Sequence, residues 1–393
     1  MDKVLNKIPR IIYVILALVF GFLIVMAIST ISKDTAGPIG TILNKAEVFI
    51  EEVEGNMILE QRENKRSDKL RWFTNIRDDK SKLINSKIIL LGASDYTQID
   101  SYEKIINLED SLNLTFQIIH IYRAWGENRE HEFPKIETQT IYELGSIPMI
   151  TWEPWVGVFS IENFPNIEPS IEKRDKGSLA SIARGDYDSY IIKWALEAKK
   201  FSHPIYLRFG HEMNDPFHYP WGPQNNLAQD YIDAWKHVFE IFESNQVENI
   251  IWVWNPHLSY DFDGYYPGDE YVDVISFGVL NFGTSLAWSK WWSFTELLSN
   301  SYKTLTKLNK PMMISEFGSL SVGGDRSEWF KDALSLIPRD YPAINSIVFF
   351  HYSAETSTDK SLDWRFIEDK KVTNELIKQM NKWPDSIQMP EQP

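Results

Sequence analysis

Residues 206 to 214 read Tyr206-Leu207-Arg208-Phe209-Gly210-His211-Glu212-Met213-Asn214, a short apolar run that ends in polar side chains. Side chains of a β-strand alternate between its two faces, so the run predicts a strand with Arg208 and Glu212 on one face. A second run of this kind, Met313-Ile314-Ser315-Glu316-Phe317-Gly318, also closes on a glutamate. Two strands that end in carboxylates indicate a candidate catalytic pair.

Eight short runs rich in β-branched and aromatic residues alternate with longer segments along the chain. They occupy residues 87–91, 116–122, 148–152, 205–212, 250–255, 272–277, 312–316 and 346–352. Helical apolar periodicity follows at 187–202, 228–244 and 294–308. No glycine-rich phosphate loop follows a strand. The pattern therefore predicts an α/β fold with a single (β/α)8 barrel rather than a doubly wound sheet.

Composition excludes several classes of function. The 393 residues are 43% hydrophobic and 24% charged, as in a folded protein, and the net charge of −15 disfavours nucleic-acid binding. The absence of cysteine excludes disulfides, thiol nucleophiles and cysteine-ligated metals. The 15 Trp, 17 Tyr and 22 Phe residues are enough to supply both a large core and faces on which sugar rings stack.

The first thirty residues predict a membrane anchor. Residues 11–28 carry no charge and, at about 1.5 Å per helical residue, cross most of a hydrocarbon core of about 30 Å. Three basic residues precede this run and one follows closely, so we expect a cytoplasmic N-terminus and an extracytoplasmic remainder. The alternative is a cleaved signal peptide and a secreted protein.

The expected domain organisation has three parts. Residues 1–30 form the anchor, and residues 31–80 form a charged stem or linker. Residues 81–388 form the catalytic barrel, and internal repeats are absent.

The chemistry of a (β/α)8 barrel gathers at the carboxyl ends of its strands. The fourth and seventh strands end at Glu212 and Glu316 and lie roughly across the barrel mouth, and retaining glycosidases use two carboxyl groups about 5–5.5 Å apart. His211-Glu212 resembles the start of a zinc-protease helix, but Asp215 stands where the second histidine belongs. No metal site is predicted. No serine nucleophile elbow follows a strand either.

Aromatic residues lie at several other predicted strand ends. About half of the tryptophans are expected in the core, and the others are expected to form sugar platforms along a cleft open at both ends. The predicted platforms are Trp125, Trp155, Tyr219, Trp221 and Trp254. Such a cleft favours internal cleavage of a polymer.

Two segments resemble the signature sequences of glycoside hydrolase family 26. Residues 206–214, followed by Tyr219-Pro220-Trp221-Gly222, are similar to the family's acid/base segment. Ile314-Ser315-Glu316-Phe317-Gly318 is similar to its nucleophile strand. Shorter matches lie at 152–155, 185–191, 252–256, 266–269, 272–274 and 363–365, so the resemblance runs from about residue 87 to 383.

The resemblance implies a retaining, endo-acting clan A glycosidase that acts on a β-linked polysaccharide. Mannan endo-1,4-β-mannosidase activity is the first expectation, and a β-glucanase directed at mixed-linkage glucan or an exopolysaccharide is the alternative. A non-catalytic, membrane-anchored glycan-binding or assembly protein is the alternative from another class. A monomer without cofactor is expected.

The resemblance also implies roles for individual residues. Glu316 would attack the anomeric carbon, and Glu212 would protonate the leaving oxygen and then deprotonate a water. His211 and Asn214 are expected to hold the sugar or the acid. Arg208, one pleat below Glu212, is expected to keep Glu316 ionised through Coulomb attraction.

Two positions depart from the family pattern. Asp215 stands where the family usually has glycine after Met-Asn. Leu280, in Val279-Leu280-Asn281, stands where the family has a tyrosine directed at the nucleophile. We expect the second departure to remove one hydrogen bond from the Glu316 carboxylate.

Overall fold

The computed structural model describes residues 20–21, 66, 68–94, 102–286, 290–355 and 362–384. The chain divides into two compact units, Met1–Val53 and Glu54–Pro393, and nearly all described residues belong to the second. The predicted anchor at residues 11–28 lies, apart from Phe20 and Gly21, outside the described residues. Within the described ranges, no helix combines the length and apolar character needed to cross a membrane.

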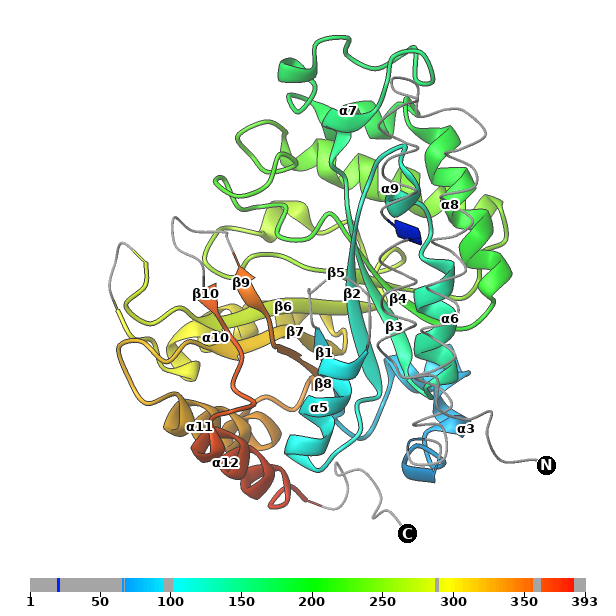
Figure 1. Cartoon of the computed structure of the whole chain (residues 1–393). Coiled ribbons are helices and arrows are strands. Elements are labelled where there is room, and N and C mark those ends of the chain that lie inside the picture. The colour runs from blue at the N-terminus through cyan, green and yellow to red at the C-terminus, as the bar shows by residue number, and fades with distance from the viewer. Residues whose placement is uncertain are drawn as a thin grey trace, which may run out of the picture. The chain divides into compact units, whose positions relative to one another are not determined.

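Eight parallel strands form a closed barrel in chain order, as predicted (Figure 1). The strands are β1 (Leu90–Ser94), β2 (Ile118–Ala124), β3 (Ile147–Glu153), β4 (Ile205–Phe209), β5 (Ile250–Trp254), β6 (Val274–Asn281), β7 (Met312–Ser319) and β8 (Ile344–Phe350). Pairing of β1 with β8, with Leu90 opposite Ser346, closes the barrel. Most strand residues are buried, which explains the nearly continuous apolar runs.

Helices connect the strands and flank the barrel (Figure 1). The longer ones are α5 (Glu103–Leu112), α6 (Lys135–Glu143), α8 (Asp188–Phe201), α9 (Ala228–Ser244), α10 (Phe294–Leu305), α11 (Arg326–Asp340) and α12 (Lys370–Met380). The shorter elements are α3 (Thr74–Arg77), α4 (Lys80–Ile84), α7 (Ser178–Ala183), η1 (Arg129–His131), η2 (Val156–Val158), η3 (Ile171–Lys173), η4 (Asp263–Tyr265), η5 (Thr306–Leu308) and the hairpin β9 (Ser353–Glu355) and β10 (Leu362–Asp363). All three predicted helices are confirmed.

Sequence determines where these helices lie and begin. In α9, Tyr231, Trp235, Val238 and Phe242 recur at helical spacing and are buried. At the start of α10, the hydroxyl oxygen of Ser293 accepts a hydrogen bond from the backbone N–H of Glu296. The Glu296 carboxylate in turn accepts one from the backbone N–H of Ser293, which completes a capping box.

The floor of the barrel is closed by residues that precede β1. Leu70, Phe73 and Leu83 pack with apolar side chains from the interior of the strands, among them Met149 and Met313. Residues on both sides of the predicted boundary at 80/81 therefore share one core. Nearby, the buried guanidinium of Arg66 pairs with Glu109 on α5 at 2.6 Å.

Phe73→Ala is expected to lower the free energy of unfolding by about 3–5 kcal/mol, because the removed ring leaves a cavity under the strands. Arg71→Ala, at an exposed neighbouring position, should change it by less than about 0.5 kcal/mol. Denaturant unfolding of both full-length variants checks this. Equal stabilities would contradict the assignment of this segment to the barrel floor.

Candidate active site

Glu212 lies in a turn beyond the end of β4. The predicted strand extended to Glu212, but β4 ends at Phe209, and both Gly210 and Glu212 have φ of +51°. The backbone N–H of Glu212 donates to the carbonyl oxygen of Asn255, after β5, at 2.7 Å. The predicted alternation of side chains between two strand faces is therefore wrong beyond Phe209. A left-handed backbone conformation, which is uncommon for residues other than glycine, sets the direction of the Glu212 side chain.

Glu316 lies at a β-bulge in β7. Toward β6, Ile314 pairs with Phe277 and Glu316 with Gly278, so Ser315 is the extra residue. The pairing with β8 is irregular over the same segment. The bulge lets two consecutive side chains, Ser315 and Glu316, both contact Arg208.

The two glutamates share one small space beside Gly278 on β6. A Cβ atom at Gly278 would lie 3.6 Å from Oε1 of Glu212 and 3.9 Å from Oε2 of Glu316. The structure thus brings together the two carboxyl groups predicted to form the catalytic pair, and a glycine leaves room between them.

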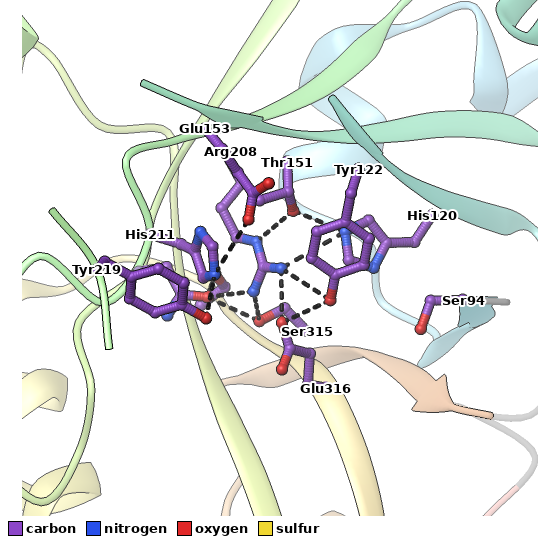
Figure 2. A network of polar contacts seen from close by, with 12 residues as sticks. Ser94, His120, Tyr122, Thr151, Glu153, Arg208, His211, Tyr219, Ser315 and Glu316 are labelled. Atoms are coloured by element: carbon purple, nitrogen blue, oxygen red, sulfur yellow. Dashed lines mark hydrogen bonds and ion pairs between the residues drawn. The ribbon is translucent and has the colours of Figure 1, made fainter. Parts of the chain in front are cut away.

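Arg208 lies at the centre of a buried polar network (Figure 2). One of its terminal nitrogens donates to Oε1 of Glu316 at 2.6 Å. Its other donors contact the side-chain oxygens of Thr151, Asn255 and Ser315 at 2.7, 2.8 and 3.1 Å. Burial opposes the charge of Arg208, but Glu316 reverses this effect, and the net pKa of Arg208 is raised. The predicted pairing of Arg208 with Glu316 is confirmed.

Tyr122 on β2 supplies a hydroxyl to the candidate nucleophile. Its O–H donates to Oε1 of Glu316 at 2.8 Å, and its ring lies near the Arg208 guanidinium. Burial, reinforced by the charge of Glu316, raises the pKa of Tyr122 well above its ordinary value, so the hydroxyl keeps its proton. Leu280 stands where the family has a tyrosine before Asn281, yet Glu316 still accepts a hydrogen bond from a hydroxyl group, that of Tyr122 on another strand.

Two buried histidines border the network and stay neutral. His120 contacts the hydroxyl of Thr151 through Nε2 at 2.7 Å, and His211 contacts that of Tyr219 at 3.0 Å. Burial, and then the charge of Arg208, lower the pKa of both histidines well below the ordinary value. Figure 2 shows the His120 and His211 side chains on opposite sides of the guanidinium.

Two carboxyl groups at the mouth have raised pKa values. Burial, and then the charge of Glu316, raise the pKa of Glu212 to about 8. Burial raises the pKa of Glu153 to about 7, although the indole N–H of Trp155 donates to it at 3.3 Å. Carboxylic acids that hold a proton near neutral pH are suited to general acid catalysis.

Several predicted substrate contacts are wrong because the side chains are buried. Trp125 packs among Trp152, Tyr190 and Phe209, Trp254 packs against Phe262 and Tyr266, and Trp221 donates to the carbonyl oxygen of His211. None of these three indoles is more than 1% exposed, so none is a sugar platform in this structure.

Asn214 and His211, which were expected to hold the sugar or the acid, contact other parts of the protein in this structure. Asn214 donates to the carbonyl oxygen of His257 and accepts from its backbone N–H, at 2.9 and 2.7 Å, so it fastens the loop after β5. His211 is buried beneath Tyr219, and Arg208 is fully buried and contacts Glu316. These side chains hold the site together rather than a sugar.

Trp155 and Tyr219 remain as platform candidates. Trp155 is 38% exposed, and Tyr219 is partly exposed and stacks on the buried Trp221 with ring centroids 4.7 Å apart. Trp221 thus lies under Tyr219 and beside Trp155, which it meets edge-on.

Trp221→Ala is expected to lower the free energy of unfolding by about 3–5 kcal/mol, because a buried indole is lost. Trp155→Ala should keep the melting temperature and weaken oligosaccharide binding about 5- to 30-fold, which corresponds to about 1–2 kcal/mol for one stacked ring. Thermal melts and titration calorimetry separate the two effects. A Trp221→Ala protein that melts like the parent would contradict its core position.

Sequence reasoning did not assign roles to Tyr122, His120, Thr151, Glu153 or Ser315. Tyr122 and Glu153 were visible at predicted strand ends, which is the signal that could have singled them out. Thr151 and His120 lie within strands, where sequence offers no sign that they face the barrel interior.

One cluster offers ligand atoms of the kind that bind metals. Glu212, Asp215 and His257 place such atoms within 4.8 Å of one another. However, both oxygens of Asp215 accept hydrogen bonds, from His218 and from the backbone N–H of Phe217, and Nδ1 of His257 accepts one from Ser259. We assign no metal to these residues.

Known proteins resemble this chain in sequence. The glycosyl hydrolase family 26 model matches residues 180–323. Endoglucanase H of Acetivibrio thermocellus is 33% identical over 258 residues, which are 63% of this chain but 25% of that protein. The chain thus spans about a quarter of that relative's length. A β-1,3-xylanase of a Vibrio species is 28% identical over 105 residues, 25% of this chain and 22% of the xylanase.

Solved structures share the fold. A family 26 β-mannanase from Bacteroides ovatus superposes with a TM-score of 0.54 at 16% identity, covering 79% of this chain and 93% of that chain. The Bacillus subtilis mannanase BCman gives a TM-score of 0.54 at 18% identity, covering 81% and 90%. The segment matched by the family model contains both Glu212 and Glu316, so the two candidate catalytic residues lie in the part of the chain that matches glycosyl hydrolase family 26.

Proposed function

We propose that this protein is a retaining, endo-acting β-glycanase in which Glu316 is the nucleophile and Glu212 the acid/base. The observation that carries the proposal is the contrast between two carboxyl groups beside Gly278. Oε1 of Glu316 accepts hydrogen bonds from the cationic guanidinium of Arg208 and from the hydroxyl of Tyr122. The carboxyl group of Glu212 receives no hydrogen bond from the described residues, and burial keeps it protonated.

In the proposed reaction, Glu316 attacks the anomeric carbon while Glu212 protonates the departing glycosidic oxygen. The resulting glycosyl-enzyme is then hydrolysed by a water whose proton passes to Glu212. Arg208 and Tyr122 hold the Glu316 carboxylate in place in the first step, and they stabilise it again when it leaves the sugar in the second.

The pH dependence follows from the raised pKa of Glu212. A carboxyl group with a pKa of about 8 is protonated below that pH and loses its proton above it. Because the first step requires the protonated form, kcat/KM for a polysaccharide should fall with an apparent pKa near 8 as the pH rises. Initial rates over pH 4 to about 10 measure this limb. A decline centred at the ordinary glutamic acid value would contradict the assignment.

A β-1,4-linked polysaccharide is the proposed substrate. The likeness to mannanase structures supports mannan, and the 33% identity to a protein named endoglucanase H supports a glucan as the second candidate. A reducing-sugar assay against mannan, β-1,4-glucan, mixed-linkage glucan and an exopolysaccharide tests the choice. An endo enzyme should lower polymer viscosity before monosaccharide accumulates, whereas a non-catalytic glycan-binding protein would bind polymer and release no product.

The cellular location is a separate proposal, which rests on the uncharged run at residues 11–28 and the basic residues before it. According to this proposal, the barrel lies on the outer side of the cell membrane. The full-length protein should partition into detergent, and external protease should digest the barrel in intact cells. A mature N-terminus near residue 30 would instead establish a secreted form.

A further inference from the structure

Asp215 lies in the same turn as Glu212 and is held as a carboxylate. Its backbone N–H donates to the carbonyl oxygen of Glu212 at 2.9 Å, and its side chain is fully buried. Nδ1–H of His218 donates to Oδ2 at 2.5 Å, and the backbone N–H of Phe217 donates to Oδ1 at 2.8 Å. Burial alone would raise the pKa of Asp215, but these hydrogen bonds lower it below its ordinary value.

The carboxyl groups of Asp215 and Glu212 approach each other closely. One carboxylate oxygen of Asp215, one of Glu212 and one ring nitrogen of His257 all lie within 4.8 Å of one another. At this separation a negative charge on Asp215 disfavours a negative charge on Glu212. Other titratable groups also act on Glu212 or respond to it: Glu316, Arg208, His218, His257, Tyr219 and Tyr260.

The charges around Glu212 differ between the two steps of the proposed reaction. In the first step Glu316 is ionised, and its charge favours the protonated form of Glu212. In the glycosyl-enzyme, one oxygen of Glu316 is bonded to the sugar, so this negative charge is gone. Asp215 takes no part in covalent chemistry and keeps its charge throughout.

We propose that Asp215 is a positioning residue whose permanent charge keeps Glu212 an effective base during hydrolysis of the glycosyl-enzyme. This inference rests on the proposed function. In that step the water oxygen bonds to the anomeric carbon, and the water proton moves to Glu212. The bond between Glu316 and the sugar breaks, and its electron pair returns to the Glu316 carboxylate.

Asp215→Asn in the full-length protein tests the inference with an aryl β-glycoside whose good leaving group makes the second step rate-limiting. Without the charge, Glu212 is a weaker base, and kcat should fall roughly tenfold, because one pKa unit corresponds to a tenfold change in equilibrium. The acid limb of kcat should move to lower pH, and a burst of aryl alcohol should precede the steady state. Asp263→Asn, which removes an exposed carboxylate on η4, is the matched control and should leave both limbs in place.

His218→Gln provides a test with the opposite sign. The charge of His218 lowers the pKa of Glu212, so its removal should shift the acid limb of kcat to higher pH. Opposite shifts in Asp215→Asn and His218→Gln would establish the electrostatic role. If Asp215→Asn instead lowered kcat while both pH limbs stayed in place, Asp215 would be purely structural and the inference wrong. Failure of the proposed function itself would be recognised by a different result, namely unchanged turnover in Glu212→Gln and Glu316→Gln.

Discussion

Glu316→Gln should lower kcat by at least roughly four orders of magnitude, because an amide cannot form the glycosyl-enzyme. Glu212→Gln should lower it by about 10²- to 10⁴-fold on a polysaccharide, whose leaving oxygen needs a proton. The loss in Glu212→Gln should be much smaller on an activated aryl glycoside, which separates the acid from the nucleophile. Steady-state kinetics of both variants on both substrates provide the measurement.

The control for these variants is their folding. Glutamine retains an oxygen that accepts from Arg208, so Glu316→Gln should unfold cooperatively and keep its circular dichroism spectrum. Azide should restore activity to Glu316→Ala and yield a glycosyl azide of inverted anomeric configuration, because a small anion then occupies the place of the carboxylate. If both glutamine variants turned over polysaccharide at nearly the parent rate, neither carboxyl group would carry the chemistry.

Gly278→Val is expected to reduce kcat/KM by about 10²- to 10³-fold. Its Cβ would lie in ordinary contact with both carboxyl groups, at 3.6 Å from Glu212 and 3.9 Å from Glu316. The two further methyl groups would enter the space beside the carboxyl groups or displace them, and a displacement of about 1 Å from reactive geometry costs about a hundredfold.

Gly278→Ala is the matched control, because its single methyl group fits at ordinary contact distance. It should reduce kcat/KM by less than about tenfold. Kinetics and thermal melts of both variants test the prediction. Full activity in Gly278→Val would mean that the sugar does not pass between Glu212 and Glu316.

Fold class and the candidate catalytic pair were accessible from sequence because their signals are local. Each barrel strand is a short apolar run, and α9 has its buried residues at helical spacing, so hydrophobic pattern alone located them. Glu212 follows β4, Glu316 lies in the carboxyl-terminal half of β7, and the carboxyl ends of barrel strands always meet at one mouth. The pairing of Arg208 with Glu316 follows from the same geometry, since both side chains point inward.

The details of the site depend on contacts that no local pattern contains. The bulge at Ser315 appears in the pairing of β7 with β6, and the left-handed backbone of Glu212 donates to the carbonyl oxygen of Asn255 in another loop. Tyr122 donates to Glu316 across 194 positions of the chain, whereas the family pattern led us to expect that Glu316 would lack one hydroxyl partner because of Leu280.

Burial of the tryptophans was likewise decided by the tertiary structure. Trp125 and Trp254 stand at strand ends as Trp155 does, and Trp221 lies in the loop after β4, yet only Trp155 of these four is exposed. An indole is apolar over most of its surface and carries one donor, so it suits a core and a sugar platform equally well. Which of the two it becomes depends on the loops and helices that cover it, and only the packed chain determines that.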